Sequence, residues 1–175
     1  MVHIEKSHDL LDTFKHTKLT KVILESRFSA DTTEGLVRNN KFTLACMRDC
    51  FLKGEAPYAS HVIYAQTHIL DDFIANERAL GMHAGFLWGD LGEKTVVYTD
   101  LGISTGMKMG IEHANLMNRK IEFRELGFIP KVSSEEIDLE NKRLNLQKQY
   151  LNELKSSLQS QDDMCLSRLK RKYDK

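Results

Sequence analysis

The chain has 175 residues, of which 41% are hydrophobic and 29% charged, and its formal net charge is zero. This length suits one globular domain with an appendage, and a zero net charge argues against broad, charge-driven binding to nucleic acid. No window approaches the run of about 18 apolar residues that a membrane span needs, and no apolar signal segment opens the chain, so we expect a cytoplasmic protein without a membrane partner.

Strands and helices are predicted in alternation along the first 125 residues. Residues 1–20 are a polar segment in which three apolar side chains at helical spacing allow a short amphipathic helix. Short β-branched runs predict strands, and longer runs with capping residues and amphipathic spacing predict helices. The predicted strands are residues 21–26, 56–64, 95–98 and 120–124, and the predicted helices are residues 33–52, 77–91 and 105–117.

This alternation is typical of an α/β domain with a mainly parallel sheet of four to five strands and helices on both faces. Pro57 stands at the start of its strand, where a missing N–H is tolerated. Leu80, Ala84, Leu87 and Trp88 share one side of the helix predicted at 77–91. In such sheets ligands bind at the carboxyl ends of the strands, which places the candidate site near residues 25–28 and 98–104.

The composition changes after residue 128, so we divide the chain into a segment 1–20, a domain 21–128 and a helical tail 129–175. Ser133 and Ser134 precede two glutamates, which is a favourable helix start. Ile137, Leu144, Leu151 and Leu158 recur every seven residues, but only one of the complementary heptad positions is apolar. The tail is therefore predicted to be a long helix that packs on the domain, stays solvated, or pairs weakly with a second copy.

The three cysteines predict no cofactor. Cys46 and Cys50 lie four residues apart and share a helical face, which favours two small core side chains. A zinc site would need further cysteines or histidines at matching spacing, and none is present around them or around Cys165. We therefore predict neither a metal nor a redox cofactor.

Residues 98–107 contain the strongest candidate site. A buried strand ends before Asp100, a glycine-containing turn follows, and Ser104, Thr105 and Gly106 open a helix that continues through Met107. Free N–H groups and two hydroxyls at a helix start suit a phosphate or carboxylate, and Asp100 suits sugar hydroxyls. The alternative is that Asp100 or Ser104 only caps the helix.

Two further segments are predicted to complete a pocket. After the first strand come Ser26, Arg27, which suits a phosphate, and Phe28, which suits stacking on a base. In the next strand segment, Tyr58 and His61 are candidates for the pocket wall. For each of these side chains the alternative is a purely structural role.

The same segments resemble a known family. Residues 25–26, 54–61 (GEAPYASH), 70–72, 77–78 and 97–104 (VYTDLGIS), with Gly106, Gly110 and the glycines between 85 and 89, resemble an uncharacterised domain family of phages and bacteria. That family is in turn similar to the nucleoside 2-deoxyribosyltransferases and related nucleotide-binding domains. The resemblance implies a flavodoxin-like sheet and a pocket for a nucleoside-like or nucleotide-like ligand.

The resemblance also implies an N-glycosidic reaction, whose attacking group in those enzymes is a glutamate a few residues into the helix after the glycine turn. This chain has Gly110 at that position, or Lys108 after a shift of two, and Glu112 is predicted to face away. The carboxylate must then come from Asp100, Glu25 or Asp72, or else the domain binds without cleaving.

These expectations give three functional hypotheses. The first is a protein that binds a nucleotide-derived small molecule, such as a signalling nucleotide that a phage removes to counter host defence. The second is an N-glycoside hydrolase or base transferase with Asp100, Glu25 and His61 as catalytic candidates. The third is an interaction protein that works through the tail. The predicted ligand-binding residues are Ser26, Arg27, Phe28, Tyr58, Asp100, Ser104, Thr105, Gly106 and Met107.

Overall fold

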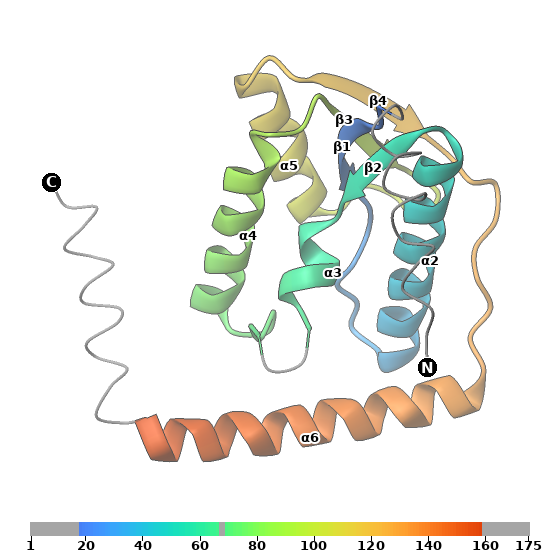
Figure 1. The fold of residues 1–175 in the computed structure, drawn as a ribbon. Helices are drawn as coiled ribbons and strands as arrows, with labels where there is room; N and C mark the ends of the chain where they lie inside the picture. Colours follow the sequence, from blue (N-terminus) through green and yellow to red (C-terminus); the bar gives the residue numbers. More distant parts are fainter. Residues whose placement is uncertain (1–17, 67–68, 159–175) are drawn as a thin grey trace, which may run out of the picture.

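The computed structural model describes residues 18–66 and 69–158, which form a parallel four-stranded sheet with helices on both of its faces (Figure 1). The strand order is β2-β1-β3-β4, the arrangement of a flavodoxin-like sheet, which confirms the predicted fold class. The strands are β1 (Thr20–Glu25), β2 (Glu55–Tyr58), β3 (Lys94–Tyr98) and β4 (Lys120–Arg124).

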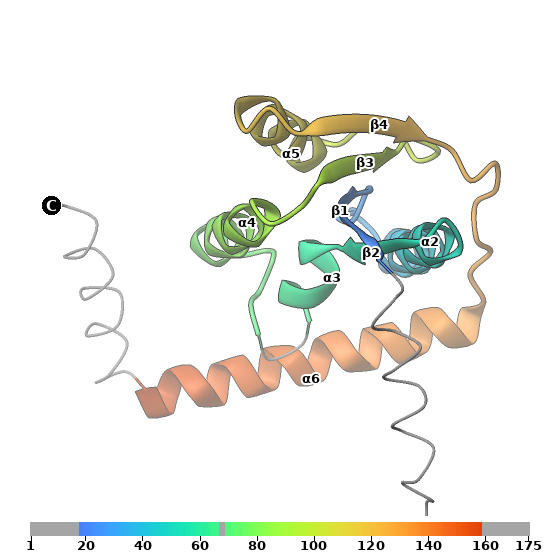
Figure 2. The same ribbon diagram turned by 45° about the horizontal axis from the view of Figure 1, so that its top comes forward.

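The helices follow the connections between the strands. Helix α2 covers one face of the sheet, whereas α4 and α5 cover the other, as the two views in Figures 1 and 2 show. Each parallel connection is long enough to carry a crossover helix. The helices are α2 (Thr33–Leu52), α3 (Ser60–Tyr64), α4 (Ala75–Gly89), α5 (Thr105–Leu116) and α6 (Ser134–Leu158).

The core lies between α2 and the two central strands. Val22 and Leu24 of β1 and Val96 and Tyr98 of β3 are buried, and they pack against α2 side chains that include Phe42. Cys46 and Cys50 are free thiols in this cluster, as predicted for small core residues. A thiol is a weaker hydrogen-bonding group than a hydroxyl, so burying it in this apolar layer costs less.

One expectation about local structure was wrong. The run at residues 56–64 is not one strand, because β2 pairs only with the first four residues of β1 and ends at Tyr58, after which α3 begins. In α4, Leu80, Leu87 and Trp88 are exposed, and the buried residues of this helix are Gly85 and Gly89. A short apolar run does not distinguish a strand from a helix, and an apolar stripe does not always mark the buried face.

Helix α6 lies across the end of the domain at which the strands terminate (Figures 1 and 2). Thr33 Oγ1 donates to Asn141 Oδ1 at 2.8 Å, and Lys41 Nζ pairs with Glu136 at 2.6 Å. The described part of the tail therefore packs on α2. The helix predicted within residues 1–20, Cys165 and the tail beyond residue 158 lie outside the described residues.

Replacing Thr95 with valine is expected to raise the free energy of unfolding by about 1 kcal/mol, because the Thr95 hydroxyl is fully enclosed and lacks a hydrogen-bond partner within the described part of the chain. Valine keeps the shape and removes the unpaired oxygen. Urea denaturation followed by circular dichroism would measure the change. Thr43→Val is the control and should destabilise, since the Thr43 hydroxyl bonds both Ser26 and the carbonyl of Asn39. A lower stability for Thr95→Val would contradict this reasoning.

Candidate functional site

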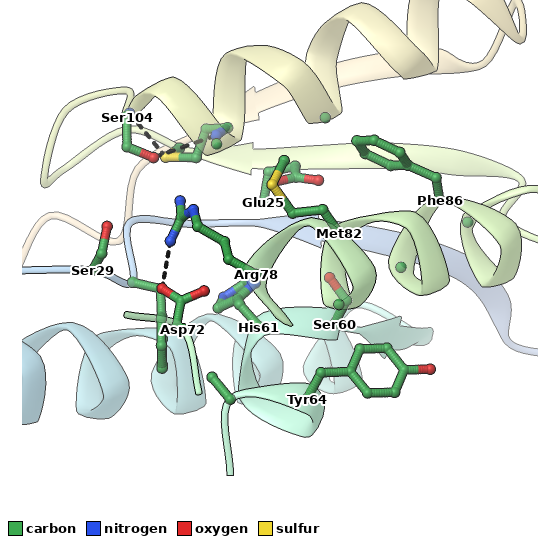
Figure 3. A pocket seen from close by; sticks show the side chains of 18 of the residues that line it. Glu25, Ser29, Ser60, His61, Tyr64, Asp72, Arg78, Met82, Phe86 and Ser104 are labelled. Carbon is green, nitrogen blue, oxygen red and sulfur yellow. Dashed lines mark hydrogen bonds and ion pairs between the residues drawn. The ribbon is translucent and has the colours of Figure 1, made fainter. Parts of the chain in front are cut away.

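A pocket opens at the carboxyl end of β1, between α3, α4 and the first turns of α5 (Figure 3). We call it the central pocket. Its cavity volume is about 100 Å³, and it extends toward solvent. Its wall combines apolar and ionisable side chains, which is typical of small-molecule sites. The lining includes Glu25, Ser26, Phe28, Ser60, His61, Asp72, Arg78, Met82, Phe86, Ser104, Gly106, Met107, Gly110 and Arg119.

Glycines create the space for this pocket. Gly81, Gly85 and Gly89 recur every four residues and therefore form one side of α4. A Cβ at Gly85 would lie 2.7 Å from Ser60 Oγ, so α3 and α4 approach too closely there for any side chain. From the opposite wall, Gly106 and Gly110 of α5 also face the pocket.

Glu25 is the last residue of β1, and its side chain lies on the pocket wall. Its carboxyl makes no hydrogen bond or ion pair with any residue that the structure describes. Burial raises the pKa of Glu25 to about 8, although the positive charge of Arg119 opposes this shift. At neutral pH the group is therefore mostly protonated and can both donate and accept a hydrogen bond. A titratable side chain with a perturbed pKa in a pocket is a candidate functional residue.

The Glu25 carboxyl fills the space beside Gly110. A Cβ built on Gly110 would lie 2.2 Å from Glu25 Oε1 and 2.5 Å from Glu25 Cδ. No side chain at position 110 can coexist with this carboxyl. The carboxyl of β1 thus lies where the first atoms of a residue-110 side chain would be.

His61 lies on the first turn of α3 and belongs to a chain of hydrogen bonds. Thr43 Oγ1 donates to the carbonyl of Asn39, so the Ser26 hydroxyl, 2.7 Å away, must donate to Thr43. Ser26 then accepts from His61 Nε2 at 3.1 Å. Burial lowers the pKa of His61 to about 4, so the ring is neutral at pH 7. This tautomer leaves Nδ1 as an acceptor, and none of the described residues donates to it.

A cationic group lies at the start of α5. Figure 3 shows Arg78 extended from α4 between Asp72 and the turn at Ser104. Arg78 is ion-paired with Asp72, and its Nη2 lies 3.5 Å from where a Cβ on Gly106 would be. Ser104 Oγ caps α5 by accepting from the N–H of Met107, while the other first-turn N–H groups have no partner within a helix. A guanidinium beside such a turn suits an anionic group.

The structure places seven of the predicted residues on the central pocket: Glu25, Ser26, Phe28, His61, Ser104, Gly106 and Met107. Four others do not line it. Arg27 Nη1 donates to the carbonyl of Leu101, Tyr58 donates to the Tyr64 hydroxyl, and Asp100 accepts from the N–H groups of Leu126 and Gly127. The contacts of Arg27 and Asp100 stabilise loops, and that of Tyr58 joins β2 to α3. Thr105 is exposed and does not line the cavity.

Sequence reasoning missed Arg78, Arg119 and the glycine side of α4. Asp72, one of the candidate carboxylates, also lines the pocket, where it is paired with Arg78. Lys108 and Glu112 are exposed, so neither reaches the cavity. The spacing of Gly81, Gly85 and Gly89 is the one signal that pointed to a close approach on this side of α4.

The fold and the site together define a class: a flavodoxin-like α/β domain with a pocket at the carboxyl ends of its strands. Residues 20–124 match the domain of unknown function DUF7768, and because this match covers more than half of the chain, the chain belongs to that family. No curated protein and no solved structure matches the chain. Within residues 18–66 and 69–158, no helix is both long and apolar enough to cross a membrane, and no cluster of three or more His, Cys, Asp or Glu suits a metal ion.

Proposed function

We propose that the protein binds a nucleotide-derived small molecule in the central pocket. The observation that carries this proposal is the Glu25 carboxyl, which lies on the pocket wall with a raised pKa and bonds to none of the residues that the structure describes. The carboxyl borders the cavity, so a ligand there can bond to it, and such a ligand explains its position. A signalling nucleotide of a defence system is the class of ligand to test first, in view of the resemblance to phage and bacterial domains.

The two ends of the pocket match the two ends of a nucleotide. Arg78 and the first turn of α5 suit a phosphate. The protonated Glu25 carboxyl and the free Nδ1 of His61 suit the donors and acceptors of a sugar or a base. Phe28 and Met82 add apolar contact area on the wall.

The affinity for a phosphate-bearing ligand is expected to fall as the pH rises through about 8, because Glu25 then becomes negative and repels the ligand. In Glu25→Gln, which imitates the protonated acid, the affinity should stay flat between pH 6 and 9. Calorimetric titration at several pH values would measure this. Glu112→Gln, an exposed acid on α5, is the matched control and should follow the wild type. Unchanged affinity in Glu25→Ala at pH 7 would place the ligand elsewhere.

Cleavage of an N-glycosidic bond is the second candidate, and the contact between Glu25 and Gly110 favours it. The resemblance implies a glutamate at position 110, and here a carboxyl from β1 fills that space. As a carboxylate Glu25 can attack the sugar carbon while the bond to the base breaks. The rate should then rise with pH toward 8, opposite to the trend expected for binding alone.

One experiment separates the two candidates. The protein is incubated with nucleosides, nucleotides, NAD and ADP-ribose, and the mixture is analysed by mass-resolved chromatography before and after denaturation. A compound that leaves solution and returns intact supports binding. A released base that disappears in Glu25→Gln but persists in Glu112→Gln supports the enzyme. If no compound is retained or changed, both candidates fail.

A further inference from the structure

A second cavity adjoins the central pocket beneath α6. We call it the tail cavity. Its wall comes from the segment after β1, from α2, from the segment before α4, and from α6, which supplies Leu144 and Gln147. Phe28, Ser29 and Asp72 line both cavities, so the two spaces meet there. The volume of the tail cavity is about 170 Å³, which is larger than that of the central pocket.

Gln147 is the unusual side chain of this cavity. It is only 8% exposed, yet its amide makes no hydrogen bond with any residue in the described part of the chain. Among those residues, Thr95 Oγ1 is the only fully enclosed side-chain atom that lacks a partner, so the amide atoms of Gln147 still touch the cavity space. Burying an amide without a hydrogen-bond partner lowers the stability of the protein, whereas an apolar side chain at the same position would not.

The charges around the tail cavity exclude a second phosphate. Arg143 is paired with Glu140, and Asp72 is paired with Arg78. Asp71 also lines the cavity and adds a negative charge. An anion would meet repulsion here, whereas a neutral or weakly cationic group with amide, hydroxyl or ring-nitrogen atoms would bond to Gln147 and contact Phe73.

We infer that the tail cavity is the second half of one ligand site, and that the ligand is a two-part molecule of dinucleotide size. This inference rests on the proposed function: one nucleoside lies in the central pocket, and a second, non-anionic unit reaches Gln147 past Ser29. The connecting phosphates would pass Arg78, which lines the central pocket and pairs with Asp72, a residue that lines both cavities. Helix α6 is then part of the binding site and not an appendage.

The test compares AMP with two dinucleotides that contain it, NAD and diadenosine diphosphate, by calorimetric titration of the full chain. At least one dinucleotide is expected to bind about tenfold more tightly than AMP. Gln147→Leu should remove this gain and leave the affinity for AMP unchanged. Gln149→Leu, an exposed glutamine on the same helix, is the matched control and should behave as the wild type.

Thermal unfolding without ligand provides a second readout. Because Gln147 has no hydrogen-bond partner among residues 18–66 and 69–158, Gln147→Leu should unfold at the same temperature as the wild type or higher. A lower temperature would show a structural role and overturn the inference. If AMP binds but neither dinucleotide gains affinity through Gln147, the inference fails and the proposed function stands. If neither AMP nor a dinucleotide binds and the broader panel also yields no ligand, both fail.

Discussion

Replacing Gly110 with alanine is expected to weaken ligand binding at least about tenfold. This is the usual effect of losing one strong hydrogen bond between a protein and its ligand, here the bond from the Glu25 carboxyl. The added Cβ would lie 2.2 Å from Glu25 Oε1, so the carboxyl must leave its place on the pocket wall. If the protein cleaves its ligand, turnover should fall further than affinity, because the reacting group itself is displaced. Calorimetric titration and base release would measure the two effects.

Two double variants separate the steric effect from the chemical one. Gly110→Ala with Glu25→Gly relieves the clash and should recover stability but not binding. Glu25→Gly with Gly110→Glu places a carboxyl in nearly the same part of the pocket, now from α5 in place of β1, and should recover binding in part. If Gly110→Ala alone binds as the wild type does, Glu25 is not a ligand contact.

Replacing Arg124 with methionine is expected to lower the free energy of unfolding by about 3 kcal/mol or more, the usual cost of breaking a buried ion pair. The guanidinium makes two hydrogen bonds to Glu55, at 2.7 and 2.8 Å, and the Glu55 side chain is only 5% exposed. Its removal leaves that buried carboxylate with Lys94 as its remaining cation. Guanidinium chloride denaturation would measure the loss.

The dependence of the unfolding free energy on pH below about 4.5 tests the same ion-pair network of Arg124, Lys94, Glu55 and Glu122. Hydrogen bonds from Arg124 lower the pKa of Glu55 and of Glu122 to about 2, so both contribute stability above their unfolded pKa of about 4.5 and lose it as the pH falls toward 2. Arg124→Met should flatten this acid dependence, and adding Glu55→Gln should recover part of the stability. Lys53→Met, which removes an exposed pair with Asp49, is the control and should cost less than about 1 kcal/mol. An equal loss in both single variants would contradict a stabilising role for the network.

The elements that could be predicted were those with local signals. Helix α2 begins and ends at the predicted residues, because Thr32 caps its start and Gly54, with a positive φ of 72°, follows its end. Strand β4 also has its predicted bounds. The strand predicted at residues 56–64 was wrong because the length of β2 depends on its pairing with β1. This partner is distant in the sequence, so residues 56–64 alone do not show where the pairing ends.

The site could be predicted only in part for the same reason. The central pocket lies at the predicted ends of β1 and β3, because parallel strands bring their carboxyl ends to one edge. The contact between Glu25 and Gly110 joins residues 85 positions apart in the sequence, and neither has a local feature that marks it. Asp100 was a reasonable catalytic candidate from its position after β3, but its carboxylate is occupied by two backbone N–H groups of the β4 loop.

The glycines of the central pocket lower the stability of the helices that contain them, but they keep the cavity open. Alanine at a helix-interior position such as Gly81 would favour the helix by about 0.5–1 kcal/mol. Its Cβ would meet the flexible end of Leu70 at 3.2 Å and make an ordinary contact with the Cβ of Tyr64 at 3.6 Å. At Gly106 the added atom would make an ordinary contact with Arg78, at 3.5 Å. Selection for thermal tolerance alone would therefore replace these glycines and fill the cavity, and only selection for the ligand would retain them.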